Sequence, residues 1–440
     1  MKKKLRLMLL LAAAVFILSG CNMRTVDELY RLPKRSKTYA NIQSQIDKNM
    51  QGRDYCAPVS GENRQTVQIA DLDGDGKVEY IVFAKGSSDK PLKILIFSGK
   101  DDNYVLVGVI ESTGTAFERV EYVRMNKTGG YELVVGRQVS DQVVRSVSVY
   151  SMDGGEIEHM LSANYSNFVC ADLDSDSVSD LMIMRPGSAG SLTGAAEFYS
   201  LAGDTPERSV EVNMSESVDQ IKRIMVSKLN DGKPAVYVAS AVGTNAIITD
   251  VFAVVDKEFV NVTLSSESGT SVQTLRNYYV FADDIDNDGV LELPSLIPMV
   301  LPNDELPSAN HQLVRWYTMD SQGHETNKLY TYHNFVAGWY MHLDVASAQR
   351  VVVEQFGNTY TFSIWDDDYE NAQKLMIVYA LTGQNREEQA TINNRIVLHR
   401  TESTIYAADL EPASANYGIT KEGLINSFHL ILEDWKTGET

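Results

Sequence analysis

The nine residues Asp71-Leu-Asp-Gly-Asp-Gly-Lys-Val-Glu79 decide how this chain folds, because the same pattern occurs twice more. The other copies are Asp172-Leu-Asp-Ser-Asp-Ser-Val-Ser-Asp180 and Asp284-Ile-Asp-Asn-Asp-Gly-Val-Leu-Glu292. Each copy places carboxylates at its first, third, fifth and ninth positions. A tight turn with that spacing directs several oxygen ligands at one centre, as Ca²⁺ requires with its ~6–8 oxygens. The sequence therefore predicts up to three calcium sites.

Two simpler interpretations of these loops are solvated Asp/Gly turns and EF-hands. One copy fits a solvated turn, but three copies in one register favour a metal site, since acids this close repel one another without a cation. An EF-hand needs a bidentate Glu at position 12, where these loops have Val82, Ile183 and Ser295. The flanking segments, such as Val67–Ala70, also alternate as strands do. The EF-hand is therefore excluded.

An apolar strand, the motif D-x-D-x-D-G-x-x-[DE] and a second apolar strand together resemble the FG-GAP or VCBS repeat, the calcium-loop blade unit of integrin-α-like β-propellers. The second loop departs from the pattern, because Ser177 stands where the others have Gly76 and Gly289. A left-handed residue costs roughly 1 kcal/mol more with a side chain, so we expect this loop to bind calcium least tightly. The resemblance implies that the ligands are one main-chain carbonyl per loop, from residue 77, 178 or 290, and the carboxylates of Asp71, Asp73, Asp75 and Glu79; Asp172, Asp174, Asp176 and Asp180; and Asp284, Asp286, Asp288 and Glu292.

Short strands broken by Gly, Asn, Asp and Ser fill the chain from about residue 65 to 334, which is typical of an all-β fold. Two degenerate copies of the motif, Asn126–Glu132 and Leu229–Ala235, lie between the acidic ones, so five units repeat at about fifty residues, a period typical of propellers. We therefore predict a mainly β fold, a β-propeller of about five four-stranded blades over residues 53–334. A sixth blade follows if residues 53–64 pair with a strand from the C-terminal side. In the first unit we expect strands at Val67–Ala70, Tyr80–Ala84, Leu92–Phe97 and Tyr104–Ile110.

The period is lost after the fifth unit, and we expect residues 335–440 to form a small α+β domain. The order of its elements resembles that of the small PsbP-like α/β domains. A closing helix is predicted from an N-cap at Thr420 to about Trp435, because five apolar residues share one face: Leu424, Ile425, Phe428, Ile431 and Leu432. Its predicted strands are residues 338–343, two strands within 350–365, and 375–381, 395–398 and 404–409.

The first twenty residues have the composition of an export signal. Four basic residues at positions 2, 3, 4 and 6 precede an apolar run over residues 7–18, which is shorter than the ~20 residues that span a bilayer. The sequence Leu18-Ser-Gly-Cys21 resembles the lipobox of bacterial lipoproteins. This resemblance implies that residues 1–20 are removed and that Cys21 is lipidated. We then expect a protein anchored to a membrane on its extracytoplasmic face, at the cell surface or in a periplasm.

Removing four positive charges with residues 1–20 takes the formal net charge from −20 to −24, which argues against a nucleic-acid partner. Residues 22–50, within the expected tether of residues 21–52, are weakly basic. Beside a lipid they suit an anionic membrane surface, and a solubilising linker explains them nearly as well. Within this tether Ile42, Ile46 and Met50 repeat every four residues and predict a short helix over Thr38–Met50.

Two cysteines remain after such processing, Cys56 and Cys170. They either form one disulfide outside the cytoplasm or stay as free thiols. Cys170 lies in the apolar segment Phe168–Ala171, where a buried free thiol is at least as good an explanation.

No catalytic motif stands out among the other acids and histidines. The acids Asp366, Asp367 and Asp368 fit a turn between strands, and His333 and His342 lack a nearby nucleophile motif. We therefore expect a non-catalytic lipoprotein whose calcium-stabilised propeller binds a protein or polysaccharide of the cell envelope or exterior. Two alternatives stay open: a carbohydrate-active enzyme on a five-bladed propeller, and a structural subunit of an envelope secretion or assembly complex.

Overall fold

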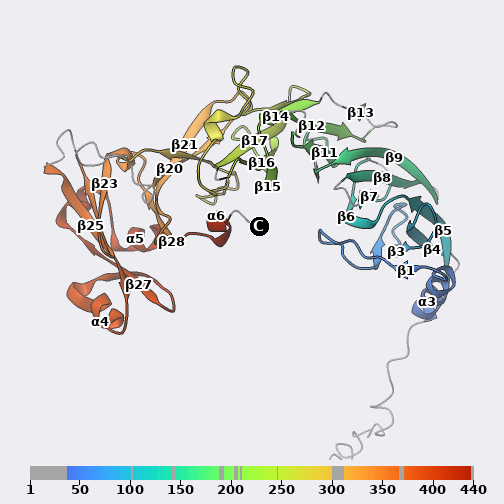
Figure 1. The fold of residues 1–440 in the computed structure, drawn as a ribbon, viewed down its shortest axis with the longest axis horizontal. Helices are drawn as coiled ribbons and strands as arrows, with labels where there is room; N and C mark the ends of the chain where they lie inside the picture. The colour runs from blue at the N-terminus through green and yellow to red at the C-terminus, as the bar shows by residue number, and fades with distance from the viewer. Residues whose placement is uncertain are drawn as a thin grey trace, which may run out of the picture. The chain divides into compact units, whose positions relative to one another are not determined.

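The computed structural model describes residues 37–100, 103–127, 129–139, 144–153, 155–187, 193–202, 207–208, 211–244, 246–299, 312–365 and 371–437. The export signal, Cys21, residues 22–36 of the tether and Asp366–Asp368 lie outside these ranges. Within them the chain is mainly β, and its strands form six antiparallel sheets of four or five strands, many of them labelled in Figure 1. The chain divides into two compact units, residues 1–58, 65–71 and 76–113, and residues 59–64, 72–75 and 114–440.

The first unit contains the first sheet and one helix. Its strands run in the order β1-β3-β4-β5, and β2 shares with β1 one edge of β3. All four strands predicted for the first sequence repeat are present, and each begins and ends within three residues of its expected bounds. The strands are β1 (Asp54–Tyr55), β2 (Val67–Ala70), β3 (Glu79–Lys85), β4 (Leu92–Lys100) and β5 (Asn103–Ser112).

The predicted short helix is confirmed as α3 (Lys37–Asn49). Ile42, Ile46 and Met50 are buried in one cluster with side chains of β3 and β4, including Val82 and Phe97. This contact explains the four-residue spacing, since that spacing places the three side chains on one helix face.

The sixth blade built from residues 53–64 and a C-terminal strand is wrong. Asp54 pairs with Lys85, inside the first sheet. The amides of Val59 and Ser60 donate to the carbonyls of Phe117 and Glu118, at 3.1 and 2.8 Å. The described hydrogen bonds of residues 54–60 therefore go to segments before residue 120, and none goes to the C-terminal strand that a sixth blade requires.

The second unit contains the other five sheets. The second sheet is β6 (Ala116–Val123), β7 (Glu132–Gln138), β8 (Arg145–Asp153) and β9 (Glu156–Tyr165). The third is β10 (Asn167–Ala171), β11 (Asp180–Arg185), β12 (Thr193–Ser200), β13 (Glu207–Arg208) and β14 (Val212–Glu216). The fourth is β15 (Gln220–Lys228), β16 (Pro234–Val242), β17 (Ala246–Val255) and β18 (Glu258–Asn261), followed by the short helix η1 (Val272–Thr274).

The fifth sheet is β19 (Leu293–Ile297), β20 (Gln312–Met319), β21 (Glu325–Asn334), β22 (Trp339–Leu343) and, from much later in the chain, β28 (Phe428–Leu430). The sixth sheet runs in the order β23 (Val351–Phe356), β24 (Thr359–Ile364), β25 (Gln373–Thr382), β27 (Thr404–Leu410) and β26 (Ile396–Arg400). The later strand predictions are thus confirmed, but residues 339–343 extend the fifth sheet rather than the C-terminal one. The short helices here are η3 (Ala348–Arg350), α4 (Arg386–Thr391), η5 (Ile392–Asn394), η6 (Pro412–Tyr417), α5 (Lys421–Ser427) and α6 (Glu433–Thr437).

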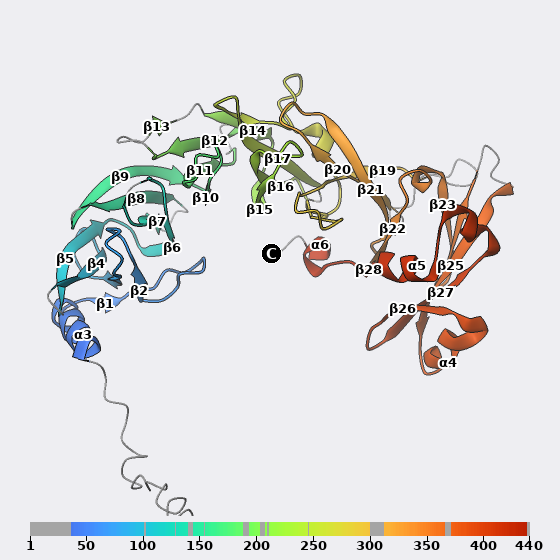
Figure 2. The ribbon, with the colours of Figure 1, turned by 180° about the vertical axis from the view of Figure 1, so that it is seen from behind.

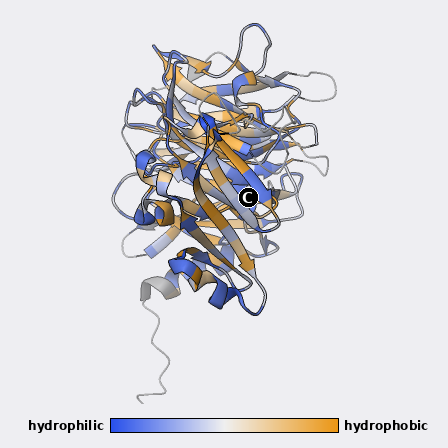
Figure 3. Cartoon of the chain, turned by 90° about the vertical axis from the view of Figure 1, so that its left-hand side faces the viewer, coloured by the Kyte–Doolittle hydropathy of each residue, from blue (hydrophilic) through white to orange (hydrophobic). Residues whose placement is uncertain are grey.

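Apolar side chains fill the space between successive sheets of the second unit. One cluster joins the second and third sheets, for example Val149 with Phe168, and another joins the third and fourth, for example Met182 with Phe252. Two further clusters join the fourth and fifth sheets, and the largest joins the fifth and sixth through Trp339. Figure 3 shows hydrophobic segments along the strands. Burial on both faces explains why the central strands are almost continuously apolar.

The single closing helix over Thr420–Trp435 is wrong, because the segment breaks into α5, β28 and α6. Thr420 is the N-cap of α5 as predicted, and its hydroxyl accepts the Gly423 amide at 3.1 Å. β28 then pairs with the edge of β22, which offers unpaired backbone groups. Ile425 and Leu432 are 37% and 46% exposed, so the apolar spacing did not reflect one buried helix face.

The segment after β28 packs between the fourth and fifth sheets. Trp435 is buried against Trp316, with ring centroids 5.7 Å apart, and shares a cluster with Ile247 of β17. Asp434 forms an ion pair with Arg223 of β15 at 2.6 Å. On the sixth sheet, α4 packs beside β26 and β27, as Figure 2 shows. Among the described residues, no helix is long and apolar enough to cross a membrane.

Candidate metal centres

The first two acidic loops each connect two antiparallel strands, the third follows a single bridge residue, and in all three the residue before the loop pairs with its ninth residue. Ala171 pairs with Asp180, and Asp283 pairs with Glu292. These strand flanks agree with the exclusion of the EF-hand. The chain reverses through left-handed residues at loop positions four and six, and Ser177 has the left-handed conformation predicted for it, with φ 77°. The hairpin thus gathers side chains from a short stretch of sequence around one point.

In all three loops the acids of positions one, three and nine converge. Each offers one carboxylate oxygen, and the three oxygens lie within 4.8 Å of one another. The converging sets are Asp71, Asp73 and Glu79; Asp172, Asp174 and Asp180; and Asp284, Asp286 and Glu292. The acids of position five, Asp75, Asp176 and Asp288, lie outside these sets. Instead, Asp176 and Asp288 each accept the amide two residues later, at 3.1 and 2.9 Å.

Backbone amides hold the first acid of each loop in place. Asp172 accepts the amides of Asp176 and Ser177, at 3.1 and 3.0 Å. Asp284 accepts the corresponding amides of Asp288 and Gly289, both at 2.9 Å. An Asp side chain that bonds its own turn in this way orders the loop before any ligand binds.

The ninth acids give the strongest indication that these loops could bind a cation. Asp180 and Glu292 have no solvent-exposed surface. One oxygen of Asp180 accepts the Leu173 amide at 2.9 Å, and one oxygen of Glu292 accepts the Ile285 amide at 3.0 Å. The other oxygen of each, Asp180 Oδ1 and Glu292 Oε1, is buried without a hydrogen-bond partner among the described residues. A buried polar atom left unpaired costs ~1–3 kcal/mol, and more when charged. A cation bound beside the oxygen in each loop would remove that penalty.

The electrostatics of the two ninth acids agree with this geometry. Burial raises the pKa of Asp180 to about 7, and the neighbouring acids of its loop add to the shift. Burial and the same kind of acidic neighbours raise the pKa of Glu292 to about 7. Without a cation, the negative charge of each site is therefore held unfavourably.

Two lysines contact the acidic loops differently. Lys328 of β21 lies 3.3 Å from Asp286, one of the converging acids, and also pairs with Asp288. Lys127 lies 3.3 Å from Asp176, which is outside the converging set. The ammonium group of Lys328 therefore competes directly with a cation at the third loop, whereas that of Lys127 does not occupy the converging acids of the second.

The degenerate loop before β7 keeps the ninth acid without the cluster. One oxygen of Glu132 accepts the Met125 amide at 2.6 Å, as Asp180 and Glu292 accept theirs. The other oxygen accepts the side-chain amide of Asn126, at loop position three. The second degenerate loop is shorter, since the Leu229 amide bonds directly to the Lys233 carbonyl at 2.8 Å.

The two described cysteines are unpaired, and His333 belongs to a cluster of packed rings. Cys56 and Cys170 are both free thiols, and burial raises the pKa of Cys170 well above its usual value. His333 is buried, and its pKa falls to about 3 because burial disfavours its charged form. Its ring stacks on Tyr340, with centroids 5.0 Å apart, which indicates a packing role.

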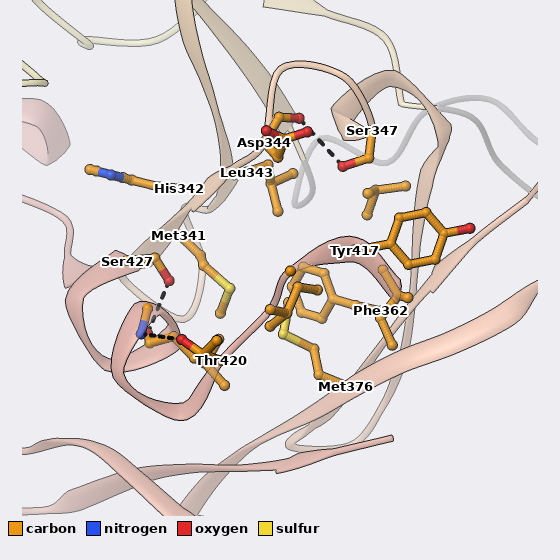
Figure 4. Close-up of a pocket in the computed structure, with 16 residues that line it drawn as sticks. Met341, His342, Leu343, Asp344, Ser347, Phe362, Met376, Tyr417, Thr420 and Ser427 are labelled. Carbon is orange, nitrogen blue, oxygen red and sulfur yellow. Dashed lines mark hydrogen bonds between the residues drawn. The ribbon is translucent and has the colours of Figure 1, made fainter. Parts of the chain in front are cut away.

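Two cavities were not predicted from the sequence, since the wall of each comes from several separate segments of the chain. One, of about 410 Å³, lies between β22, β24, β25 and α5. Figure 4 shows Phe362 and Met376 inside it, Asp344 and Ser347 at one side, and His342 turned away. The other, of about 580 Å³, adjoins the second acidic loop. Of the segments that line this second cavity, only the acidic loop was identified from the sequence as a candidate site.

Comparison with known proteins does not assign a family. The sequence matches no family model and no curated protein. Among solved structures, the rhamnogalacturonan lyases YesX and YesW each share 13% identity over 73% of this chain at a TM-score of 0.29, and the matches cover 65% and 66% of those proteins. The chain thus spans just under two thirds of each lyase. A putative 6-phosphogluconolactonase from Bacteroides uniformis shares 10% identity over 70% of this chain and 95% of its own, at a TM-score of 0.25. Similarities this low define neither the fold family nor the activity of this chain.

Proposed function

We propose that this chain is a non-catalytic, calcium-binding β-propeller protein of the FG-GAP or VCBS type, held by lipidated Cys21 on the extracytoplasmic face of a membrane. Its sheets would present a surface to a protein or polysaccharide ligand. The observation that carries the calcium part is the pair of buried, unpartnered oxygens, Asp180 Oδ1 and Glu292 Oε1, beside two further acids in each loop. The anchor is supported by the lipobox-like residues 18–21.

The donor set selects the kind of metal. Every converging side chain is a carboxylate, and hard oxygen donors suit Ca²⁺ or Mg²⁺ rather than zinc or copper. Mg²⁺ requires near-octahedral geometry and keeps several waters, while Ca²⁺ accepts an irregular loop with many protein oxygens. A loop that places its ninth acid in the core, away from solvent, therefore favours Ca²⁺.

Asp180 and Glu292 connect the metal to stability. Asp180 is the first residue of β11, and Glu292 directly precedes β19. Each accepts a hydrogen bond from a backbone amide of its own loop. Through these acids, a bound cation would hold the hairpin closed. At one hundred times Kd, each site would stabilise the folded state by ~2.7 kcal/mol. Extracellular calcium modules bind at about 10⁻⁴–10⁻³ M, which fits an extracytoplasmic location.

Thermal unfolding of the full chain in detergent tests this proposal. We expect the midpoint to rise with calcium up to millimolar concentrations, and to rise less with magnesium. The double variant Asp172→Asn/Asp174→Asn should lose part of the rise, because it removes two converging carboxylates. Asp89→Asn, at an exposed acid outside the loops, should keep all of it. A calcium concentration of about 5 mM exceeds the Kd range given above. The proposal would be contradicted by an unfolding midpoint that is the same in EDTA and at this calcium concentration.

A further inference from the structure

The cavity of about 580 Å³ has a calcium loop as one wall. Asp174 and Ser175 border it from the loop, Ser200 from the end of β12, and Asp256 and Lys257 from the turn between β17 and β18. The cavity therefore lies between the third and fourth sheets. Its volume falls within the ~300–1,000 Å³ of typical small-molecule sites.

Lys257 is available to a ligand. It is exposed, and within the described part of the chain its ammonium group has no hydrogen-bond or ion-pair partner. Asp256 and Lys257 have φ of 50° and 72° in a two-residue turn closed by the pairing of Val255 with Glu258. This tight hairpin turn holds the base of the lysine at the cavity. Lys233, also on the wall, is instead bonded to Asp231 at 3.1 Å.

The rest of the lining is a mixture of hydroxyl groups and apolar surface. The hydroxyls of Ser175 and Ser200 have no partner among the described residues, so both can bond a ligand. Asp256 adds an acceptor for ligand hydroxyls. Phe198 and Val254 supply an apolar patch. Hydroxyl and carboxylate groups around an apolar patch suit a sugar ring, which has polar edges and a less polar face.

The charges point to an acidic sugar. The converging acids of the loop number three, fewer than the ~6–8 oxygens that Ca²⁺ takes, so positions remain for water or ligand oxygens. Asp174, one of the three, is exposed to the cavity. With calcium held there, the cavity would be bordered by a divalent cation and the ammonium of Lys257. Such a pair favours a carboxylate over a neutral ligand.

We propose that this cavity binds a uronic acid residue of an acidic oligosaccharide, with the carboxylate facing Lys257 and the calcium loop and the ring hydroxyls facing Ser200 and Asp256. This inference rests on the calcium binding proposed above. It narrows the ligand proposed there, a protein or a polysaccharide, to an acidic oligosaccharide.

Isothermal titration of the full chain with a galacturonic acid trimer tests the inference. In calcium we expect binding, lost in EDTA and at least about tenfold weaker for the uncharged galactose trimer. Lys257→Gln should weaken trimer binding about tenfold while calcium binding, titrated separately, stays unchanged. Ser200→Leu, which places an apolar side chain in the cavity, should also weaken it. Lys374→Gln, at an exposed lysine of β25 outside the cavity lining, is the control and should bind as the parent does.

The outcomes separate the two proposals. Calcium binding without trimer binding would overturn the inference and leave the proposed calcium function standing. Equal trimer binding by the parent and Lys257→Gln would also overturn it, because the cavity would not be the site. Absence of both calcium and trimer binding would overturn both.

Discussion

The second acidic loop and the degenerate loop before β7 each have a buried acid at position nine, but the hydrogen bonding of that acid differs between the two loops. Asp180 and Glu132 each accept the amide of loop position two. The second oxygen of Glu132 accepts the side-chain amide of Asn126, whereas the second oxygen of Asp180 has no partner in the part of the chain that the structure describes. The ninth acid is thus a structural element of the hairpin in both loops. In the function proposed above, the residue at position three, Asn126 or Asp174, decides whether the protein itself or a cation completes the bonding of the ninth acid.

The largest expected effect is on calcium-dependent stability. Asp180→Asn keeps an acceptor for the Leu173 amide but removes the charge. In saturating calcium we expect it to lower the free energy of unfolding by about 2–3 kcal/mol, the stabilisation that one site supplies at one hundred times Kd. In EDTA the same substitution should cost little, because it also removes a buried charge. Denaturant unfolding in both buffers measures the difference.

Glu132→Gln is the matched control for that experiment. Its loop has no converging acids, so whatever it costs should be the same in calcium and in EDTA. If Asp180→Asn and Glu132→Gln showed the same dependence on calcium, the distinction between the two loops would be wrong.

A second prediction ranks the calcium affinity of the second and third acidic loops. Lys328→Met should strengthen calcium binding at the third loop about three- to tenfold, because the lysine contacts Asp286 and Asp288. Lys127→Met should change the affinity of the second loop by at most about twofold, since this lysine is 60% exposed and contacts only Asp176. Calorimetric calcium titration of both variants gives the comparison. A larger change for Lys127→Met would reverse the assignment.

This ranking differs from the expectation drawn from Ser177. That residue suggested that the second loop binds calcium least tightly, whereas the contacts of Lys328 identify a competing charge at the third. The two effects are separable, because strain at Ser177 acts on folding of the loop and Lys328 acts on the cation.

The smallest expected effect concerns that strain. Ser177→Gly should raise the free energy of unfolding by about 1 kcal/mol, because a left-handed φ of 77° favours glycine. Gly289→Ser, at the equivalent position of the third loop, should lower it by a similar amount, because φ there is 82° and the space that a β-carbon would enter is open. Denaturant unfolding of both variants measures the changes. Equal stabilities of both variants and the parent would show that these loops tolerate side chains at position six without strain.

Local features of this fold were predictable from the sequence, and long-range ones were not. The acidic loops, their flanking strands and the left-handed Ser177 follow from residues within one hairpin. Lys328 reaches Asp288 from forty positions away, so no local pattern indicated it. The sequence identified Asn126 only as the start of a degenerate copy of the motif. Its position three places a side-chain amide where the acidic loops have a carboxylate, which could have predicted a hydrogen bond to Glu132 in place of a cation.

The C-terminal segment shows the same limit. Leu424, Phe428 and Ile431 have helical spacing, yet Leu424 and Phe428 pack in the cluster between the fifth and sixth sheets and Ile431 in the cluster between the fourth and fifth. Periodicity counts buried positions but does not say against which surface each one is buried. The cavity beside the second loop was invisible for a related reason, because its walls come from four separate segments.

The burial of Trp435 has a consequence for the order of folding. Its ring completes a cluster that includes Ile247 and Trp316, residues synthesised well before it. Domains generally form as units as they leave the ribosome or a membrane channel, N-terminal parts first. Here the fourth and fifth sheets must wait for residues 428–437 before their shared core is closed. Until then their apolar faces stay exposed, so a chain that lacks residues 428–437 is expected to be prone to aggregation.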